Sequence, residues 1–303
     1  MSDSNSNSNS NSGSNSGSNV NSNSITPYIG SLEGKTALIT GASRGIGEAI
    51  AYNLASKGAK LILNYVSSSS ARLCADTALM LQQQFGLDHI VIKADMGSLT
   101  GPADLIRTAA LMVPHLRLDI IVNNAGTQST AKIADTTAEE FGRVYSLNVR
   151  GPLLLMKAAL PFLPNDRTGR IVNISSLSAT AGYSNQSIYG GAKAALDAMT
   201  RTWSRELAEH ATVNSVNPGP VLTDVLKVLP TSPDASLFVG FSPLGNVRVG
   251  YDNDDAMRLV NIFGSRPGYV DEIACIVGMI ISNDSGYCTG QVICANGGLR
   301  MAT

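Results

Sequence analysis

The chain has 303 residues, of which 44% are hydrophobic and 15% are charged, and its formal net charge is −1. This near-neutral balance gives no basic surface for nucleic acid or an anionic membrane, so we expect neither as a partner. The 4 cysteines form no C-x-x-C pair and the 3 histidines are scattered. We therefore expect reduced thiols, no metal site and a cytoplasmic protein.

The first 24 residues, 1–24, form a tract of Ser and Asn with almost nothing apolar. Such a tract cannot bury enough surface to offset the entropy of ordering it, which predicts a disordered tail. It also lacks the cationic start and apolar core of a secretory signal. The longest apolar run near the end, residues 273–281, is too short to span a bilayer. We expect residues 25–303 to form one domain.

From Lys35 onward, short apolar segments alternate with helical ones. Strands are expected at residues 36–40, 61–63, 89–93, 118–123, 170–174, 212–216 and 290–294. Helices are expected at residues 47–58, 139–163 and 189–209. Continuously apolar strands that alternate with helices indicate a parallel sheet covered on both faces. The expected fold is α/β, a single-domain, doubly wound parallel sheet of about seven strands.

The segment Thr40-Gly-Ala-Ser-Arg-Gly-Ile-Gly47 lies between the first strand and the first helix. Glycines let the backbone turn sharply and approach a pyrophosphate, and the helix N-terminus supplies free N–H groups. A glycine trio alone is weak evidence, but a strand before it and a helix after it favour a dinucleotide site.

The end of the second strand indicates which dinucleotide binds. It carries Asn64, Tyr65, Val66, Ser67 and Ser68, without the carboxylate that usually holds the ribose hydroxyls of NAD. Arg44, inside the glycine turn, can pair with a 2′-phosphate, to which Ser67 and Ser68 can add hydrogen bonds. The sequence therefore predicts NADP(H) rather than NAD(H).

Tyr189 and Lys193 are four residues apart, and Ser176 precedes Tyr189 by thirteen. Positions i and i+4 lie on one face of a helix, so an ammonium would stand beside a phenol. We expect Lys193 to lower the pKa of Tyr189 towards neutrality, which would suit a general acid or base. Ser175 is the alternative hydroxyl, although the spacing favours Ser176. Tyr183 has no lysine four residues on and is expected to shape the substrate pocket.

Taken together, these motifs resemble the short-chain dehydrogenase/reductase family over residues 32–303, which implies a Rossmann-type fold. Asn123-Asn-Ala-Gly126 matches the family's N-N-A-G segment, and Asp95 stands where the family contacts adenine. The resemblance implies a catalytic set of Asn148, Ser176, Tyr189 and Lys193. It implies a cofactor site made of Gly41, Ser43, Arg44, Gly45, Ile46, Gly47, Tyr65, Ser67, Asp95, Asn124, Ala125, Gly126, Tyr189, Lys193, Pro218, Gly219, Val221 and Thr223.

The implied reaction is hydride transfer from NADPH to a substrate carbonyl. By resemblance, Tyr189 gives the proton, Ser176 polarises the carbonyl oxygen, Lys193 holds the ribose, and Asn148 holds a water that leads to solvent. At the C-terminus the chain departs mildly from the family, with Asn296 in place of an aspartate before Gly297-Gly298.

The segment around 220–265 is expected to form a lid over the substrate. It carries Phe238, Phe241, Leu244, Val247, Val249 and Tyr251. Such a lid favours a bulky, fairly apolar ketone, as in the fungal polyketide and aromatic-ketone reductases of secondary metabolism that the chain resembles. A surface excursion is the simpler alternative.

Other functions stay open at this point. The chain also resembles the 3-oxoacyl carrier-protein reductases, for which Arg167 and His210 would offer a thin basic docking face. A cofactor-binding regulator or a non-redox biosynthetic protein is the alternative from another class. The resemblance further implies a homodimer or homotetramer formed through the helices at 139–163 and 189–209, with Met199, Thr202, Trp203 and Leu207 as a candidate outer face.

Overall fold

The computed structural model describes residues 31–223, 242–248 and 250–301, without the side chains of residues 262–263. The expected tail at residues 1–24 lies outside this part of the chain. Within it, no helix is both long enough and apolar enough to cross a membrane.

A seven-stranded sheet forms the centre of the molecule, and every strand pair is parallel. The strands are β1 (Thr36–Ile39), β2 (Lys60–Tyr65), β3 (Ile90–Lys93), β4 (Ile120–Asn123), β5 (Gly169–Ile174), β6 (Ala211–Pro218) and β7 (Val292–Ala295). Their order is β3-β2-β1-β4-β5-β6-β7. The chain therefore reverses direction across the sheet between β1 and β4, where doubly wound folds bind their ligands. The seven expected strands are confirmed.

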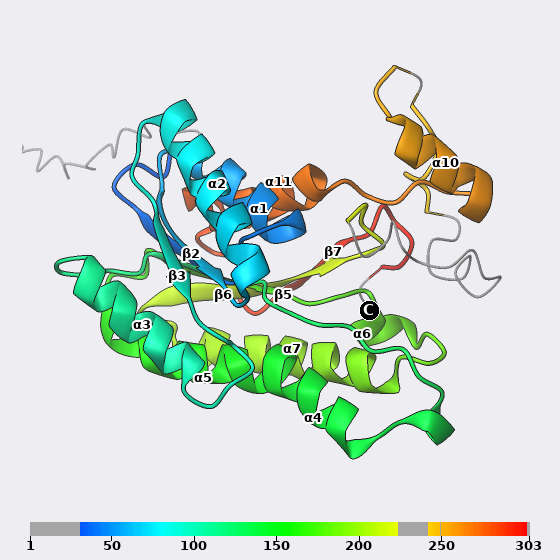
Figure 1. The fold of residues 1–303 in the computed structure, drawn as a ribbon, viewed down its shortest axis with the longest axis horizontal. Coiled ribbons are helices and arrows are strands. Elements are labelled where there is room, and N and C mark those ends of the chain that lie inside the picture. The colour runs from blue at the N-terminus through cyan, green and yellow to red at the C-terminus, as the bar shows by residue number, and fades with distance from the viewer. Residues whose placement is uncertain (1–30, 224–241, 249, 302–303) are drawn as a thin grey trace, which may run out of the picture.

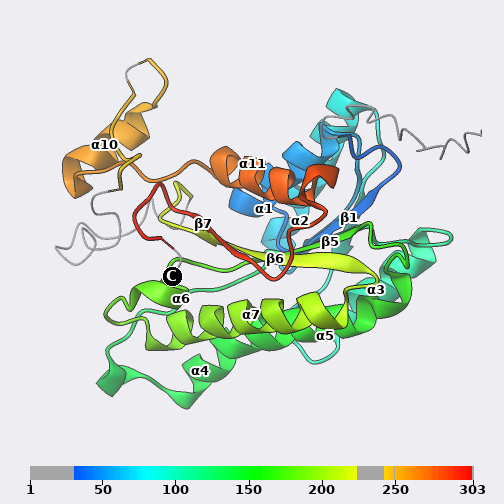
Figure 2. The same ribbon diagram turned by 180° about the vertical axis from the view of Figure 1, so that it is seen from behind.

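Helices cover both faces of the sheet (Figures 1 and 2). One layer holds α1 (Gly45–Ala55), α2 (Ser68–Phe85) and α11 (Val270–Ile281). The other holds α3 (Gly101–Met112), α4 (Ala138–Tyr145), α5 (Gly151–Ala159) and α7 (Ser187–Glu206). Each layer buries its own apolar cluster against the sheet. The strands are apolar on both sides because both of their faces are covered.

The helix expected at residues 139–163 is interrupted. It consists of α4, a π-helical turn at Ser146–Arg150, α5 and a 3₁₀ turn at Leu160–Phe162. Pro152 stands in the first turn of α5. Since proline has no N–H, it cannot give the carbonyl of Asn148 the hydrogen bond that an unbroken α-helix would supply. The break therefore falls at a predicted catalytic residue.

The candidate outer face on α7 is partly wrong. Trp203 and Leu207 are buried in the cluster beneath the sheet, at 6% and 7% exposure. The two residues are one helical turn apart, so they face the same way, towards the sheet. Thr202 is exposed, and Met199 packs against the same cluster.

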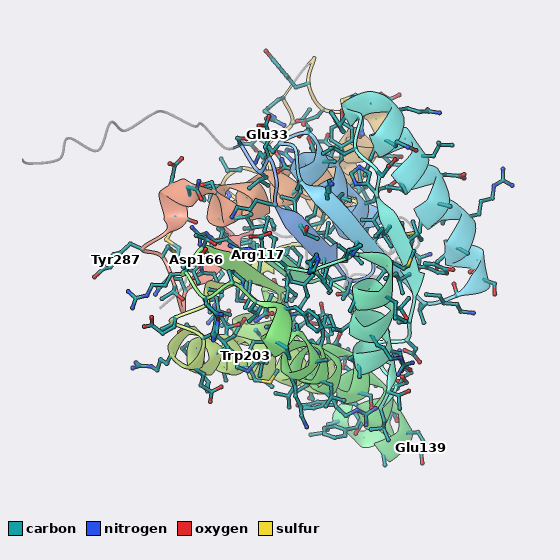
Figure 3. The ribbon with its side chains drawn as sticks, turned by 90° about the vertical axis from the view of Figure 1, so that its left-hand side faces the viewer. Glu33, Arg117, Glu139, Asp166, Trp203 and Tyr287 are labelled. Atoms are coloured by element: carbon teal, nitrogen blue, oxygen red, sulfur yellow. The ribbon has the colours of Figure 1, made fainter. Side chains whose placement is uncertain are left out.

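Charged side chains connect the starts of three strands, at the sheet edge opposite the glycine turn. Asp119 accepts from Lys35 at 3.2 Å and from Arg117 at 2.9 Å, and Arg117 also reaches Asp166 at 3.1 Å. Figure 3 shows Arg117 and Asp166 side by side at this end. The fully exposed Tyr287 points outward nearby. This network ties together the strands at the end of the sheet that lies opposite the glycine turn.

The segment expected to form the lid is described only in part. Phe238, Phe241 and Val249 lie outside the described residues. Leu244 and Tyr251 are 69% and 84% exposed, so they face solvent. Helix α10 (Asp254–Phe263) projects from the body, as Figure 1 shows. Three short helical elements complete the described chain: α6 (Ser178–Ala181) and the 3₁₀ turns at Ile133–Asp135 and Asn283–Ser285.

Candidate active site

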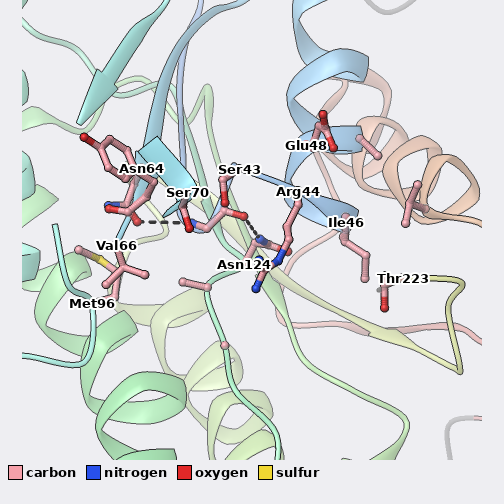
Figure 4. A pocket seen from close by; sticks show the side chains of 18 of the residues that line it. Ser43, Arg44, Ile46, Glu48, Asn64, Val66, Ser70, Met96, Asn124 and Thr223 are labelled. Atoms are coloured by element: carbon pink, nitrogen blue, oxygen red, sulfur yellow. Dashed lines mark hydrogen bonds between the residues drawn. The ribbon is translucent and has the colours of Figure 1, made fainter. Parts of the chain in front are cut away.

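A cavity of about 720 Å³ opens at the carboxyl ends of β1, β2, β3 and β4 (Figure 4). The predicted cofactor residues that line it are Gly41, Ser43, Arg44, Gly45, Ile46, Gly47, Tyr65, Asp95, Asn124, Ala125, Gly126 and Thr223. The cavity thus brings together residues that are far apart in the sequence, such as Gly41 and Thr223.

Two glycines of the turn, Gly41 and Gly47, have no room for a side chain. Gly41 has a φ of +63°, and a Cβ on it would lie 3.0 Å from the Cα of Ala125. A Cβ on Gly47 would lie 2.5 Å from the amide nitrogen of Asn124 and would clash with the carbonyl oxygen of Gly41. The backbone is therefore bare where a pyrophosphate would approach the start of α1.

Asn124 holds the glycine turn in place. Its Nδ2 donates to the carbonyl oxygens of Thr40 and Gly41 at 2.9 and 3.0 Å. The Thr40 hydroxyl accepts in return from the backbone N–H groups of Asn124 and Ala125, both at 3.0 Å. The N-N-A-G segment is thus a brace for the phosphate-binding turn as well as part of the cavity wall.

The residues at and after the end of β2 differ in whether they line the cavity. Tyr65, Val66 and Ser70 line the cavity, whereas Ser67 does not. The Ser67 hydroxyl caps α2 by accepting from the N–H of Ser70 at 3.2 Å, and it pairs with the Ser70 hydroxyl at 2.7 Å. The exposed Arg44 remains the cationic side chain of the glycine turn on the cavity wall.

Tyr189, Ser176 and Lys193 meet beyond the Gly126 end of this cavity. Burial raises the pKa of the Tyr189 hydroxyl, and hydrogen bonding from the Ser176 and Gln128 side chains acts to lower it. The Lys193 Nζ lies 5.8 Å from the centre of the Tyr189 ring and donates to the carbonyl oxygen of Ile174 at 2.7 Å. A Cβ on Gly126 would stand 3.4 Å from that Nζ, which places the lysine next to the cavity wall.

The direction of the Tyr189 pKa differs from the expectation. Burial raises the pKa of Tyr189 above its usual value, and the hydrogen bonds from Ser176 and Gln128 only oppose this in part. Burial also lowers the pKa of Lys193 to about 8, although the negative charge of Asp197 acts to raise it. Both side chains are more than nine-tenths buried, so the loss of hydration dominates both pKa shifts. A phenol that keeps its proton at neutral pH suits a proton donor.

The structure separates the two serines after β5. The Ser175 hydroxyl is buried and donates to the carbonyl oxygen of Lys193 at 3.1 Å, which engages it in holding α7. The partly exposed Ser176 hydroxyl faces Tyr189. Tyr183 is half-buried, and burial raises its pKa. The geometry therefore favours Ser176 as the working hydroxyl.

Asn148 uses its side chain to hold the loop after β4. Its Oδ1 accepts from the N–H of Thr127 at 3.0 Å, and its Nδ2 donates to the Thr127 carbonyl at 2.8 Å. A Cβ on Gly126 would be 2.9 Å from that Oδ1. The side-chain amide is thus occupied within the chain, and Pro152 has no N–H to give the backbone carbonyl of Asn148.

Pro218, Gly219 and Val221 lie outside the wall of this cavity. Gly219 donates to the carbonyl oxygen of Ala295 at 3.1 Å, and Val221 pairs with Gly268. The neighbouring Leu222 and Val270 line the cavity instead.

The comparisons agree with this geometry. The family model for short chain dehydrogenase matches residues 35–233. The chain belongs to the short-chain dehydrogenase family. L-xylo-3-hexulose reductase of Hypocrea jecorina is 43% identical over 297 residues, covering 89% of this chain and 98% of that protein. L-xylulose reductase of Aspergillus niger is 42% identical, with the same coverage.

A solved structure supports the short-chain dehydrogenase fold. The blue fluorescent protein from a metagenomic library, in complex with NADPH, is 31% identical and superposes with a TM-score of 0.76. That match covers 89% of this chain and 99% of the other. This chain is therefore an oxidoreductase of a family with a shared Rossmann-type domain.

Sequence reasoning missed Gln128, Thr127 and Arg143. Gln128 and Thr127 follow the N-N-A-G segment directly, which is the signal that could have drawn attention to them. Arg143 gave no such signal, because only the folded chain brings α4 against this loop. Ser70 was also missed, because only the turn from β2 into α2 brings it to the cavity wall beside Tyr65.

Proposed function

We propose that the protein is an NADP(H)-dependent reductase that converts a ketone to a secondary alcohol. The observation that supports this most directly is the buried Tyr189, whose hydroxyl faces Ser176 and whose ring stands beside Lys193. These groups lie next to the wall of a cavity that starts at the glycine turn. A hydroxyl pair beside a dinucleotide cavity suits proton delivery to a reduced carbonyl.

The cavity residues fit NADP(H). The bare backbone of Gly41 and Gly47 leaves room for a pyrophosphate at the start of α1. Arg44 on the wall can pair with a 2′-phosphate, while the β2 end presents Tyr65 and Val66 to the cavity in place of a carboxylate. The structural neighbour that was solved with NADPH supports the same choice. When bound, the cofactor would supply the hydride.

The chain's own groups would do the rest. Ser176 and Tyr189 would hold the carbonyl oxygen, and Tyr189 would give it a proton as charge develops there. Lys193 would hold the ribose hydroxyls and favour the phenolate that Tyr189 becomes. The backbone carbonyl of Asn148 would hold a water that returns a proton to Lys193.

We propose a polyhydroxy ketone as the substrate class. The two relatives above 40% identity are named as reductases of ketoses. Burial raises the pKa of Tyr189, and the two side chains whose hydrogen bonding acts against this, Ser176 and Gln128, are both polar. The bulky, apolar ketone inferred from the lid stays a second candidate, but the described lid residues Leu244 and Tyr251 are turned to solvent.

The carrier-protein alternative has less support. Arg167 is paired with Glu209 through bonds of 2.6 to 3.1 Å, and the His210 Nδ1 lies 2.8 Å from the carbonyl oxygen of Pro164. Both groups are thus occupied within the chain, which leaves less positive charge for an acidic carrier.

The decisive experiment is Tyr189→Phe, assayed by NADPH consumption against ketoses and apolar ketones. We expect turnover to fall by a factor of at least about 100, because the proton donor is removed. NADPH binding, followed by fluorescence, should persist. Retained turnover would refute the role of Tyr189. Binding without oxidation of NADPH by the wild type on any substrate would favour a regulator or a non-redox protein.

A further inference from the structure

A buried carboxylate lies one helical turn beyond Lys193 on α7. Asp197 follows Lys193 by four residues within this helix, so the two side chains leave the same helical face. Both residues are buried. The mechanism proposed above uses Lys193 but gives Asp197 no role.

Two buried side chains of β6 hold the carboxylate of Asp197. The Ser215 hydroxyl donates to Oδ1 at 2.6 Å, and the Asn217 Nδ2 donates to Oδ2 at 3.1 Å. Each oxygen of the carboxylate therefore accepts a hydrogen bond from the protein. This is the arrangement that a charged carboxylate needs when it lies away from water.

Lys193 and Asp197 reach neighbouring points of one strand pair. The Lys193 Nζ donates to the carbonyl oxygen of Ile174 at 2.7 Å. One residue earlier on β5, the carbonyl oxygen of Asn173 lies 3.3 Å from the same Ser215 hydroxyl that binds Asp197. Asn173 and Ser215 are partners in the parallel register of β5 and β6. The ammonium and the carboxylate are thus held next to each other against the ends of these strands.

The ammonium of Lys193 keeps donors for the cofactor. An ammonium has three N–H donors, and the Ile174 carbonyl takes one of them. Ser215 and Asn217 bind the carboxylate of Asp197, so this charge acts on Lys193 through its field and leaves N–H groups for the ribose hydroxyls. Burial lowers the pKa of Lys193 to about 8, and the negative charge of Asp197 acts to raise it.

The other charged groups around α7 do not take this part. The elements packed against α7 are α4, the π-helical turn, α6, β5 and β6, and neither α6 nor β6 carries a titratable side chain. Arg150 of the π-helical turn and Arg170 of β5 donate to backbone carbonyls at 2.6 and 2.8 Å. The other titratable side chains on these elements are Glu139, Glu140, Arg143 and Tyr145 on α4 and Tyr189, Arg201, Arg205 and Glu206 on α7. Asp197 is the charged group that acts on Lys193.

We propose that Asp197 is a positioning residue for the reduction: its buried negative charge stabilises the ammonium of Lys193, and Ser215 and Asn217 hold it in place. This rests on the proposed ketone reduction and deepens it. Neutral side chains suffice to tie α7 to the sheet, as the buried Thr200 does through a hydrogen bond to β5 at 2.8 Å. A charge at Asp197 that served only as such a tie would cost desolvation without a compensating role.

The test compares the pH–rate profile of Asp197→Asn with that of the wild type on the best substrate of a ketone panel. The substitution keeps the shape of the side chain and removes its charge. Lys193 should then lose its proton at lower pH, so the alkaline limit of kcat/KM should move down by about 1 pH unit. At about pH 8 the variant should be roughly fivefold slower, and the two enzymes should agree below about pH 6. An unmoved limit would overturn the proposal.

Thr200→Val is the matched control on the same helix. The Thr200 hydroxyl accepts from the Nδ2 of Asn173, so its removal costs a buried hydrogen bond but no charge. Stability should fall while the alkaline limit stays at the wild-type pH. An equal shift in this control would overturn the role of the Asp197 charge. If Asp197→Asn does not fold, Asp197→Ser takes its place with the same expected shift, because a smaller side chain cannot overpack the site.

NMR of protein with 13C-labelled lysine follows Lys193 directly and needs no substrate. The signal is assigned by its loss in Lys193→Met. We expect a titration midpoint at about 8 in the wild type and about 1 unit lower in Asp197→Asn. Equal midpoints would overturn the proposal whatever the turnover. A lowered midpoint in a protein that reduces no ketone would support the action of Asp197 on Lys193 and overturn the ketone reduction alone.

Discussion

Burial dominates the chemistry of the individual site residues. Tyr189 and Lys193 are 8% and 4% exposed, and both shift towards their neutral forms. The sequence places the ammonium near the phenol, but it does not show how little water remains around them. The i,i+4 spacing therefore predicted the partnership, while the direction of the Tyr189 pKa came only from the fold.

The lowered pKa of Lys193 predicts an alkaline limit for ketone reduction. Lys193 is protonated below its pKa of about 8, and it loses its charge above that value. Reduction consumes a proton that this network supplies, so kcat/KM should be level below about pH 7 and fall about tenfold per pH unit well above the pKa. The pH–rate profile with a saturating cofactor measures this. A profile that stays flat to about pH 10 would contradict it.

At the level of elements, the break between α4 and α5 decides how the site is built. The pattern of residues 139–163 predicted one helix, because its apolar periodicity runs through the π turn without a gap. Pro152 was the available warning, since an interior proline removes a helical hydrogen bond. The strands were easier to predict, because each is a short apolar run that is buried on both faces.

Close packing at the start of α5 supports the break. A Cβ on Gly151 would clash with the carbonyl oxygen of Met96, next to the predicted adenine contact Asp95. Gly151→Ala should therefore lower the free energy of unfolding by about 2 kcal/mol and weaken NADPH binding. Gly142→Ala on α4 is the control, because no heavy atom lies within 4 Å of its new Cβ.

In that control the free energy of unfolding should rise by about 0.5 kcal/mol, since alanine favours the helix. Thermal or denaturant unfolding of both variants measures the difference. Equal stability of the two variants would show that the contact with Met96 is not tight.

At the scale of the whole molecule, the sheet could be predicted almost completely from the alternation of strands and helices. The parallel strand order places the glycine turn, Asp95 and the N-N-A-G segment at one edge without any knowledge of side chains. The outer surface could not be predicted in this way. Trp203 resembles an interface residue in the sequence, and only the docking of α7 on the sheet shows that it is core.

The exposed aromatic surface of α4 is a better candidate for self-association. Phe141 is 48% exposed and stacks on Tyr145, with ring centres 4.1 Å apart. Tyr145 in turn lies against α7, because a Cβ on Gly191 would be 2.8 Å from its hydroxyl. An aromatic pair on α4 that is anchored against α7 through Tyr145 offers a rigid surface that a second copy can cover.

We therefore predict that the protein is at least a dimer and that Phe141→Glu shifts it towards monomer, because each copy would bury a charge in the shared interface. Light scattering of the purified protein measures the mass. Leu79→Glu on α2 is the matched control, since Leu79 is 52% exposed on the opposite layer and its charge should leave the mass unchanged. A monomeric wild type would contradict the predicted dimer. A Phe141→Glu variant that keeps the wild-type mass would show that the contact between copies lies elsewhere.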